Sequence, residues 1–319
     1  MIVTLTANPS HDRTVSLDAP LERGAVHRVC SVLSQAGGKG VNISRACVAA
    51  GIPSLAVLPA PADDPFVHEL LAAGIDARPV PTPHPPRVNI TVTEPDGTTT
   101  KLNSPGPDAT PQLLSALAET LQHRAATAAW VVLAGSLPPA TPERWYADLV
   151  ELLAGTGARV AVDTSDAPLR ALVEALPGAA PDLMKPNGAE LASFTGHDPD
   201  VLEADPVAAA RAAGGLVELG VGTVLVTLGA HGAVLVDAHG AWHATPPPTT
   251  VVSTVGAGDS SLFGYLLGDL QGMSTDQRLA LAVAYGSAAA GLPGTTIPRP
   301  AQVHPDLVSV RELFHTQGG

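Results

Sequence analysis

The sequence has only two cysteines, Cys30 and Cys47, and it contains no C-x-x-C pair. Neither a disulfide framework nor a zinc site is therefore expected. Basic residues are scarce as well, since 17 Lys and Arg stand against 30 Asp and Glu and the formal net charge is −13. An acidic chain is poorly suited to bind nucleic acid or an anionic membrane surface, so we expect neither as a partner.

Long hydrophobic runs are also missing. No apolar stretch reaches the length of a membrane span, and the first residues, MIVTLT, lack the basic and apolar regions of a signal peptide. We therefore expect a cytoplasmic protein. Hydrophobic residues nevertheless make up 45% of the 319 residues. This proportion predicts a well-buried globular chain, and the length predicts either two domains or one core with an appendage.

The stretch STVGAGDSS at residues 253–261 is the most informative in the chain. It predicts a glycine-rich turn that opens a helix, because Leu262, Phe263 and Leu266 follow at helical spacing. Backbone N–H groups of such a turn can converge on an anion, and the helix N-terminus adds positive potential. Asp259 at its rim would accept a proton from a hydroxyl that attacks a phosphoryl group. The alternative is that Asp259 is an ordinary N-cap and the glycines only form a tight turn.

A second glycine-rich turn, Gly37-Gly38-Lys39-Gly40, enters a helix that is predicted to run to Ala50. Three glycines around one Lys permit close approach of the backbone to a ligand and add a positive charge there. Asn42 lies one turn into the helix. The alternative is a flexible turn with a solvated Lys and an exposed Asn. We favour a binding role because Lys is scarce in this chain.

A small β-sheet is predicted in the amino-terminal third. Residues 14–17 and 26–35 look extended, and a proline-rich connector at 79–86 leads to an alternating strand at 87–93 that returns through a hairpin turn. Such a hairpin does not belong inside a parallel sheet, so it predicts a lid standing off the main sheet. Arg87 and Asn89 share one face of it, either toward a ligand or simply toward solvent.

Asp12, just past the first predicted strand, is either a turn residue or a hydrogen-bond partner for vicinal hydroxyls of a polyol. The pattern changes after residue 111 to helices that alternate with short apolar strands, including 159–163 and 223–227. This alternation predicts a doubly wound, mostly parallel α/β sheet with helices on both faces. Ligands of such folds bind at the carboxyl ends of strands. One composite site is therefore predicted from the residues that follow strands: Gly135, Ser136, Asp163, Asn187, Thr227 and Gly229.

With these motifs in order, the sequence resembles the PfkB-type, ribokinase-like carbohydrate kinases. The resemblance is carried by GGKGVN at 37–42 and STVGAGD at 253–259, and it extends to KPNGAE at 185–190 and TLGAHG at 227–232. Further segments are similar to the 1-phosphofructokinase and tagatose-6-phosphate kinase branch: LTANPSHD at 5–12, RVN at 87–89 and GSLPP at 135–139. The resemblance implies a single ribokinase-like α/β domain over residues 1–319. Its small antiparallel β lid would come from inserted segments at about 12–36 and 86–104.

The resemblance also implies an activity and its residues. The activity would be ATP-dependent phosphorylation of a phosphorylated ketohexose, with fructose 1-phosphate as first candidate and tagatose 6-phosphate or fructose 6-phosphate as alternatives. A Lys and an Arg in the sugar site suit a substrate that already carries a phosphate. Asp259 would be the base, and the backbone of Gly256, Ala257 and Gly258 would stabilise the transferred group. The acceptor would contact Asp12, Gly37, Gly38, Lys39, Asn42, Arg87, Asn89 and Ser136. The ATP site would comprise Lys185, Asn187, Thr227, Gly229, Gly232, Ser253 and Val255, with Mg²⁺ held through water by Asn187 and Glu190.

Three positions depart from the family pattern and leave the acceptor open. Residues 59–64 replace a glycine-rich segment, Pro86 stands where Thr is usual, and Ser104 stands where many members have Glu. The lid strands of the family often pair between subunits, which implies a homodimer through the lid. A hypothesis of another class is a catalytically weak sensor of phosphosugars. The intact Asp259 and Glu190 favour the kinase.

Overall fold

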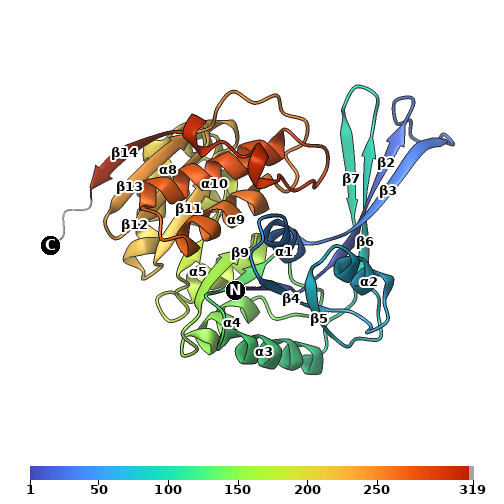
Figure 1. Cartoon of the computed structure of the whole chain (residues 1–319), viewed down its shortest axis with the longest axis horizontal. Helices are drawn as coiled ribbons and strands as arrows, with labels where there is room; N and C mark the ends of the chain where they lie inside the picture. Colours follow the sequence, from blue (N-terminus) through green and yellow to red (C-terminus); the bar gives the residue numbers. More distant parts are fainter. Residues whose placement is uncertain (316–319) are drawn as a thin grey trace.

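The computed structural model describes residues 1–315, and its main feature is a ten-stranded sheet (Figure 1). The strand order is β14-β13-β12-β11-β10-β9-β8-β1-β4-β5. All neighbours from β11 to β5 pair in parallel, whereas the three strands at the other edge pair antiparallel. The predicted doubly wound, mostly parallel sheet is thus confirmed. The strands are β1 (Ile2–Thr6), β4 (Ser54–Pro59), β5 (Asp76–Val80), β8 (Trp130–Ala134), β9 (Arg159–Asp163), β10 (Leu183–Met184), β11 (Thr223–Thr227), β12 (Ala233–Asp237), β13 (Gly240–Thr245) and β14 (Ser309–His315).

Helices cover both faces of this sheet because its strands are apolar on both sides. Successive side chains of a strand point to opposite faces. Accordingly, Val131 and Leu133 belong to one buried cluster, while Trp130 and Val132 belong to another. Helices α3, α4, α5, α6 and α8 pack on the first cluster, and α1, α9 and α10 pack on the second. The helices are α1 (Lys39–Ala49), α2 (Pro65–Ala72), α3 (Pro111–Ala125), α4 (Trp145–Leu153), α5 (Asp166–Glu174), α6 (Gly188–Thr195), α7 (Pro199–Ala204), α8 (Pro206–Glu218), α9 (Ala257–Leu270) and α10 (Thr275–Ala290).

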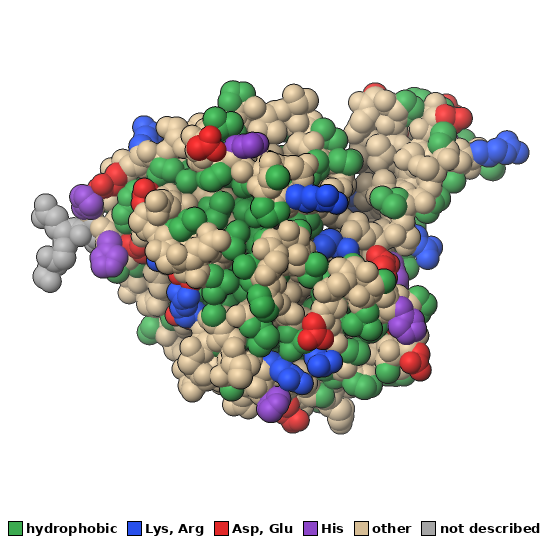
Figure 2. Space-filling view, in the orientation of Figure 1, with side chains coloured by type: hydrophobic (Ala, Val, Ile, Leu, Met, Phe, Trp, Pro, Cys, Tyr) green, Lys and Arg blue, Asp and Glu red, His purple; other side chains and the backbone are tan. Residues whose placement is uncertain are grey.

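A second sheet of four strands, here called the lid sheet, projects from the body (Figures 1 and 2). Its order is β3-β2-β6-β7, from β2 (Ser10–Leu17), β3 (Val29–Gly37), β6 (Arg87–Thr93) and β7 (Thr99–Asn103). The two outer pairs are antiparallel, as expected, but the central β2–β6 pair is parallel. Both β2 and β6 follow strands of the parallel main sheet, β1 and β5. They therefore leave the same edge of that sheet in the same direction.

Some local predictions were wrong. Strand β5 includes Pro79, which was expected in a connector, and β2 begins at Ser10, inside an expected turn. Proline is tolerated in β5 because this is an edge strand, where a missing N–H faces away from the sheet. The antiparallel strands β12, β13 and β14 are not predicted by the sequence pattern. By contrast, the strands predicted at 159–163 and 223–227 are confirmed without a shift.

Lys and Arg side chains are scattered over the face in Figure 2 and do not gather into one patch. Among residues 1–315, no helix is both long and apolar enough to cross a bilayer.

Candidate active site

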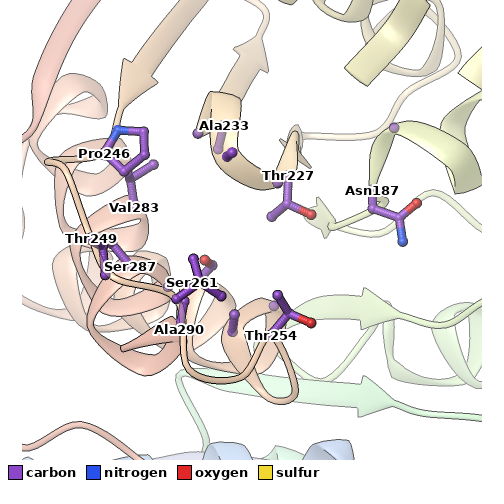
Figure 3. Close-up of a pocket in the computed structure, with 18 of the residues that line it drawn as sticks. Asn187, Thr227, Ala233, Pro246, Thr249, Thr254, Ser261, Val283, Ser287 and Ala290 are labelled. Carbon is purple, nitrogen blue, oxygen red and sulfur yellow. Dashed lines mark hydrogen bonds between the residues drawn. The ribbon is translucent and has the colours of Figure 1, made fainter. Parts of the chain in front are cut away.

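A cavity of about 800 Å³ lies beside the ends of β10 and β11 and the N-termini of α6 and α9 (Figure 3). Strand ends and helix N-termini converge here because the strands are parallel, which is the usual place for a ligand in such a fold. The cavity brings together residues that are far apart in the chain. Its lining includes eleven of the predicted site residues: Lys39, Lys185, Asn187, Glu190, Thr227, Gly229, Gly232, Gly256, Ala257, Gly258 and Asp259.

The turn that opens α9 has the geometry of an anion site. Gly256 is the N-cap and has φ 80°, a left-handed conformation that favours glycine. The first N–H groups of α9 have no partner inside the helix, and their residues line the cavity. The N–H of Ala257 donates to the carbonyl oxygen of Thr254 (3.3 Å). At Gly258 an added Cβ would lie 3.2 Å from Nζ of Lys185, so the bare glycine lets this ammonium approach the turn.

A buried carboxylate, Asp163, pairs with two lysines near this turn. Its Oδ1 accepts a hydrogen bond of 2.8 Å from Nζ of Lys39, and its Oδ2 lies 3.3 Å from Nζ of Lys185. Burial opposes ionisation of Asp163, but the two ammonium groups outweigh it and hold its pKa below the usual value. Burial likewise opposes charge on Lys39, whereas Asp163 and Asp259 raise its pKa above the usual value. Asp163 and Lys39 are therefore both charged at neutral pH.

Asp259 is buried at the base of the turn, with a side chain 6% exposed. Its Oδ2 accepts a hydrogen bond of 2.8 Å from Nδ2 of Asn42 on α1. Burial raises the pKa of Asp259 to about 6, although the positive charge of Lys39 acts in the opposite direction. A carboxylate with this pKa is ionised at neutral pH and is more basic than an ordinary Asp. This arrangement is suited to general-base chemistry.

The lid sheet presents polar side chains on the face that bears Asp12. Oδ1 of Asp12 accepts hydrogen bonds from Oγ of Ser10 (2.8 Å) and Nδ2 of Asn89 (3.1 Å). Asp12 and Asn89 lie side by side because they are register partners in the β2–β6 pair. Gly37 has no room for a side chain, since a Cβ would meet the carboxylate of Asp12. Gly38 has φ 120° and a Cβ there would lie 2.5 Å from Cγ2 of Thr6.

Arg87 at the start of β6 is held by two loops. Its Nη1 donates to the carbonyl oxygen of Ser104 (2.8 Å) and its Nη2 to Oγ of Ser136 (3.3 Å). Its Nε is buried and has no hydrogen-bond partner within residues 1–315. Burial lowers the pKa of this guanidinium, while Asp12 acts against the shift. The free N–H suits an anionic oxygen of a ligand.

Asn187 and Glu190 form a capping box at the N-terminus of α6. The Asn187 side chain accepts from the N–H of Glu190 (2.8 Å), and Oε2 of Glu190 accepts from the N–H of Asn187 (2.9 Å). Oε2 of Glu190 and Oδ1 of Asn187 are already used in this capping box, so a cation would be bound by Oε1 of Glu190 or through water. Within residues 1–315, no three His, Cys, Asp or Glu side chains gather to hold a metal. This donor set fits Mg²⁺, which usually keeps several waters and binds one or two carboxylates together with substrate phosphates.

The far end of the cavity has a largely apolar wall with two hydroxyls. Oγ1 of Thr249 and Oγ of Ser287 lie 2.6 Å apart there (Figure 3). The predicted Ser253 and Val255 are not among the lining residues; the lining instead includes Thr254. Oγ of Ser253 accepts from the N–H of Val255 (3.2 Å), which closes a local turn. The apolar wall comprises Ala233, Pro246, Pro247, Pro248, Val251, Val283 and Ala290.

Asp163 was placed in the composite site only because it ends a strand. Its role as partner of both lysines was not predicted, because it depends on contacts over many residues of chain. The remaining predicted acceptor residues, including Asp12, Arg87, Asn89 and Ser136, lie outside the cavity lining, toward the lid sheet. Lys39 and Asp259 connect the two regions, since both line the cavity and Asp259 contacts Asn42.

Comparisons with known proteins identify relatives of the chain. Over 306 residues the chain is 37% identical to a 1-phosphofructokinase of Rhodobacter capsulatus, covering 95% of this chain and 94% of that protein. It is 33% identical to the 1-phosphofructokinase of Escherichia coli K12, with 90% of each covered. Among solved structures, phosphofructokinase-2 from Escherichia coli in complex with substrates and products has a TM-score of 0.85, at 27% identity over 94% of this chain and 96% of that one. Residues 6–302 match the pfkB family of carbohydrate kinases, and the chain therefore belongs to this family.

Proposed function

We propose that this protein transfers the γ-phosphoryl group of ATP to a hydroxyl of a phosphorylated ketohexose, with fructose 1-phosphate as the first candidate. The observation that carries the proposal is the position of Asp259. Burial raises the pKa of this carboxylate to about 6, and it lies at the glycine turn, where it accepts a hydrogen bond from Asn42 of α1. The similarity to relatives named 1-phosphofructokinase supports the choice of acceptor.

The chemistry follows from the charges around the turn. Asp259 takes the proton of the attacking hydroxyl as the new O–P bond forms. The free N–H groups at the start of α9 and the ammonium group of Lys185 stabilise the charge on the transferred group. Asp163 holds both lysines in place through its two oxygens.

Mg²⁺ is the metal that this donor set would hold, through water at Asn187 and Glu190. Bound there with ATP, it would neutralise charge on the phosphates. The nucleobase would lie against the apolar wall of Pro246, Val283 and Ala290, which offers the flat contact that a purine requires.

A phosphorylated acceptor explains the two basic residues on the lid side. Lys39 and the free N–H of Arg87 would meet the acceptor's phosphate, while Asp12 and Asn89 would bind its hydroxyls. Tagatose 6-phosphate and fructose 6-phosphate are the alternative acceptors of the same class. The sensor hypothesis requires no base, so Asp259 at the turn favours catalysis. A cytoplasmic location, where ATP is supplied, accompanies the proposal.

An ADP-release assay with Mg·ATP tests this proposal. The acceptors are fructose 1-phosphate, tagatose 6-phosphate, fructose 6-phosphate, fructose, ribose and adenosine. We expect fructose 1-phosphate to exceed every other acceptor by at least about tenfold in kcat/KM. Turnover of unphosphorylated sugars or adenosine instead would contradict the roles of Lys39 and Arg87. Phosphosugar binding without any turnover would favour the sensor.

We also propose that the chain works as one ribokinase-like unit whose lid sheet is covered by a second copy of the chain. The face opposite Asp12 has an apolar part, because Val15, Val32 and Val92 are register neighbours and Ile90 pairs with Leu102. The exposed Arg13 lies on the same face. Val32 and Leu102 are each 57% exposed. Exposed apolar side chains on one face of a sheet are suited to bury each other across a two-fold axis.

Sedimentation velocity tests this dimer. We expect the native chain to sediment as a dimer and the Val32→Lys/Leu102→Lys variant as a monomer, because each subunit would bring two ammonium groups into the buried interface. Leu33→Lys is the matched control, since Leu33 is similarly exposed but pairs with Thr14 on the other face. A native monomer, or a control that dissociates equally, would contradict the proposed face.

A further inference from the structure

Asn8 joins two loops that approach the lid sheet from different parts of the chain. It lies just after β1 and is 5% exposed. Its Nδ2 donates to the carbonyl oxygen of Pro105 (3.0 Å) and to that of Leu137 (3.3 Å). Its Oδ1 lies against Gly106, where any Cβ would meet it. Both amide hydrogens of Asn8 are therefore used to hold one loop to the other.

The same two loops carry the partners of Arg87. Ser104, whose carbonyl accepts from Nη1, directly precedes Pro105, and Ser136, whose Oγ accepts from Nη2, directly precedes Leu137. Each acceptor of the guanidinium is thus one residue away from an acceptor of Asn8. Oγ of Ser104 also donates to the carbonyl oxygen of Val88 (2.6 Å), next to Arg87 on β6. The separation of the two loops determines how the guanidinium is oriented.

The orientation of Arg87 matters because its planar donors are directional. Each Nη donates one N–H to a loop and keeps a second N–H, and the buried Nε has no partner in residues 1–315. A charge-assisted bond from Nε to an anion requires the anion to lie in the guanidinium plane. A change in loop separation turns this plane and moves the donor from the position of the ligand.

We propose that Asn8 is a positioning residue for recognition of the acceptor's phosphate, and that it acts through Arg87. It makes no contact with the nucleotide cavity, so its effect is confined to the phosphorylated acceptor. This inference rests on the proposed function, in which Arg87 meets that phosphate. Selectivity for phosphorylated over free sugars then depends partly on the uncharged amide of Asn8, which acts through Arg87.

A double-mutant cycle in KM tests the proposal. Asn8→Ala removes both donated hydrogen bonds, and we expect KM for the phosphosugar to rise by about tenfold, with KM for ATP changed by less than about twofold. In an Arg87→Ala background the same substitution should raise the phosphosugar KM by less than about twofold, because residues that act through each other are not additive.

A matched control separates positioning from folding. Thr4→Val removes a buried hydrogen bond of 2.9 Å to Ser44 from β1, the strand that precedes Asn8, without touching either loop. We expect a similar loss of thermal stability but an unchanged phosphosugar KM. If Asn8→Ala does not fold, the same cycle is measured with Asn8→Ser, which keeps one donor. A smaller rise in the phosphosugar KM is then expected.

The outcomes distinguish this inference from the proposed function. If Arg87→Ala leaves the phosphosugar KM unchanged, the assignment of Arg87 fails and the inference fails with it. If Arg87→Ala raises KM but Asn8→Ala does not, only the positioning role of Asn8 is overturned. Full additivity of the two substitutions, or an equal rise in KM for ATP, overturns it as well.

Discussion

Replacing Asp259 with Asn is expected to lower kcat by about 10²–10⁴-fold, because a positioned base contributes rate enhancement of this order. Asn has nearly the same shape and can still accept the hydrogen bond from Asn42, but it cannot take a proton. KM for ATP and for the phosphosugar should therefore change by less than about threefold. Steady-state kinetics with both substrates varied would measure the separation of kcat from KM.

The pH dependence gives a second readout of the same substitution. Because burial raises the pKa of Asp259 to about 6, the base is protonated and inactive below this pH. The native kcat should rise as pH increases through about 6 and then level off. The residual activity of Asp259→Asn should lack this acid limb, since the titrating group is gone. An acid limb that persists in the variant would contradict the assignment.

A second buried aspartate on α9 provides the control. Asp269 accepts from Nε1 of Trp130 (2.9 Å) and pairs with Arg159 and Arg278, away from the cavity. Asp269→Asn should lower the melting temperature because it weakens this buried ion network, yet it should leave the acid limb in place. If the acid limb were lost simply because a buried charge was removed from α9, both Asp259→Asn and Asp269→Asn would lose it.

The parts of the site that could be predicted from the sequence are those with local causes. Gly256 and Asp259 were recognised because a glycine turn and a helix start are features of consecutive residues. Asn187 and Glu190 were expected near a metal, and the structure shows an additional local reason for their spacing. They form a capping box, which itself requires an acceptor followed three residues later by Glu.

The parts that were missed depend on contacts between distant segments. Nothing near Asp163 in the chain indicates that it pairs with Lys39, which is 124 residues away. The parallel β2–β6 pair likewise depends on how the chain returns to the lid after β5, while alternation of polar and apolar residues is the same for both pairings. Asn8 resembles an ordinary turn residue until its partners, 97 and 129 residues away, are known.

The other large effect is expected at Lys39. We predict that its ammonium group supplies positive charge to the site and influences the pH at which the rate rises. Lys39→Met keeps the unbranched stem of the side chain but removes its ammonium group. We expect kcat/KM to fall by about 10²–10³-fold, because a preorganised positive charge beside Asp259 and the acceptor's phosphate is lost. The acid limb should also move to higher pH. Burial raises the pKa of Asp259 and Lys39 lowers it, so removal of Lys39 leaves the effect of burial less opposed.

Lys39→Arg separates charge from geometry. Arg keeps the positive charge beside Asp163 and Asp259, so the acid limb should stay near that of the native protein. Its larger planar group cannot reproduce the 2.8 Å contact of Nζ with Oδ1 of Asp163 in the same space, so kcat/KM should still fall. The pH–rate profiles of the three proteins decide between these roles. An acid limb that does not move in Lys39→Met would mean that Lys39 does not set the basicity of Asp259, and its part in catalysis would then be limited to binding phosphate.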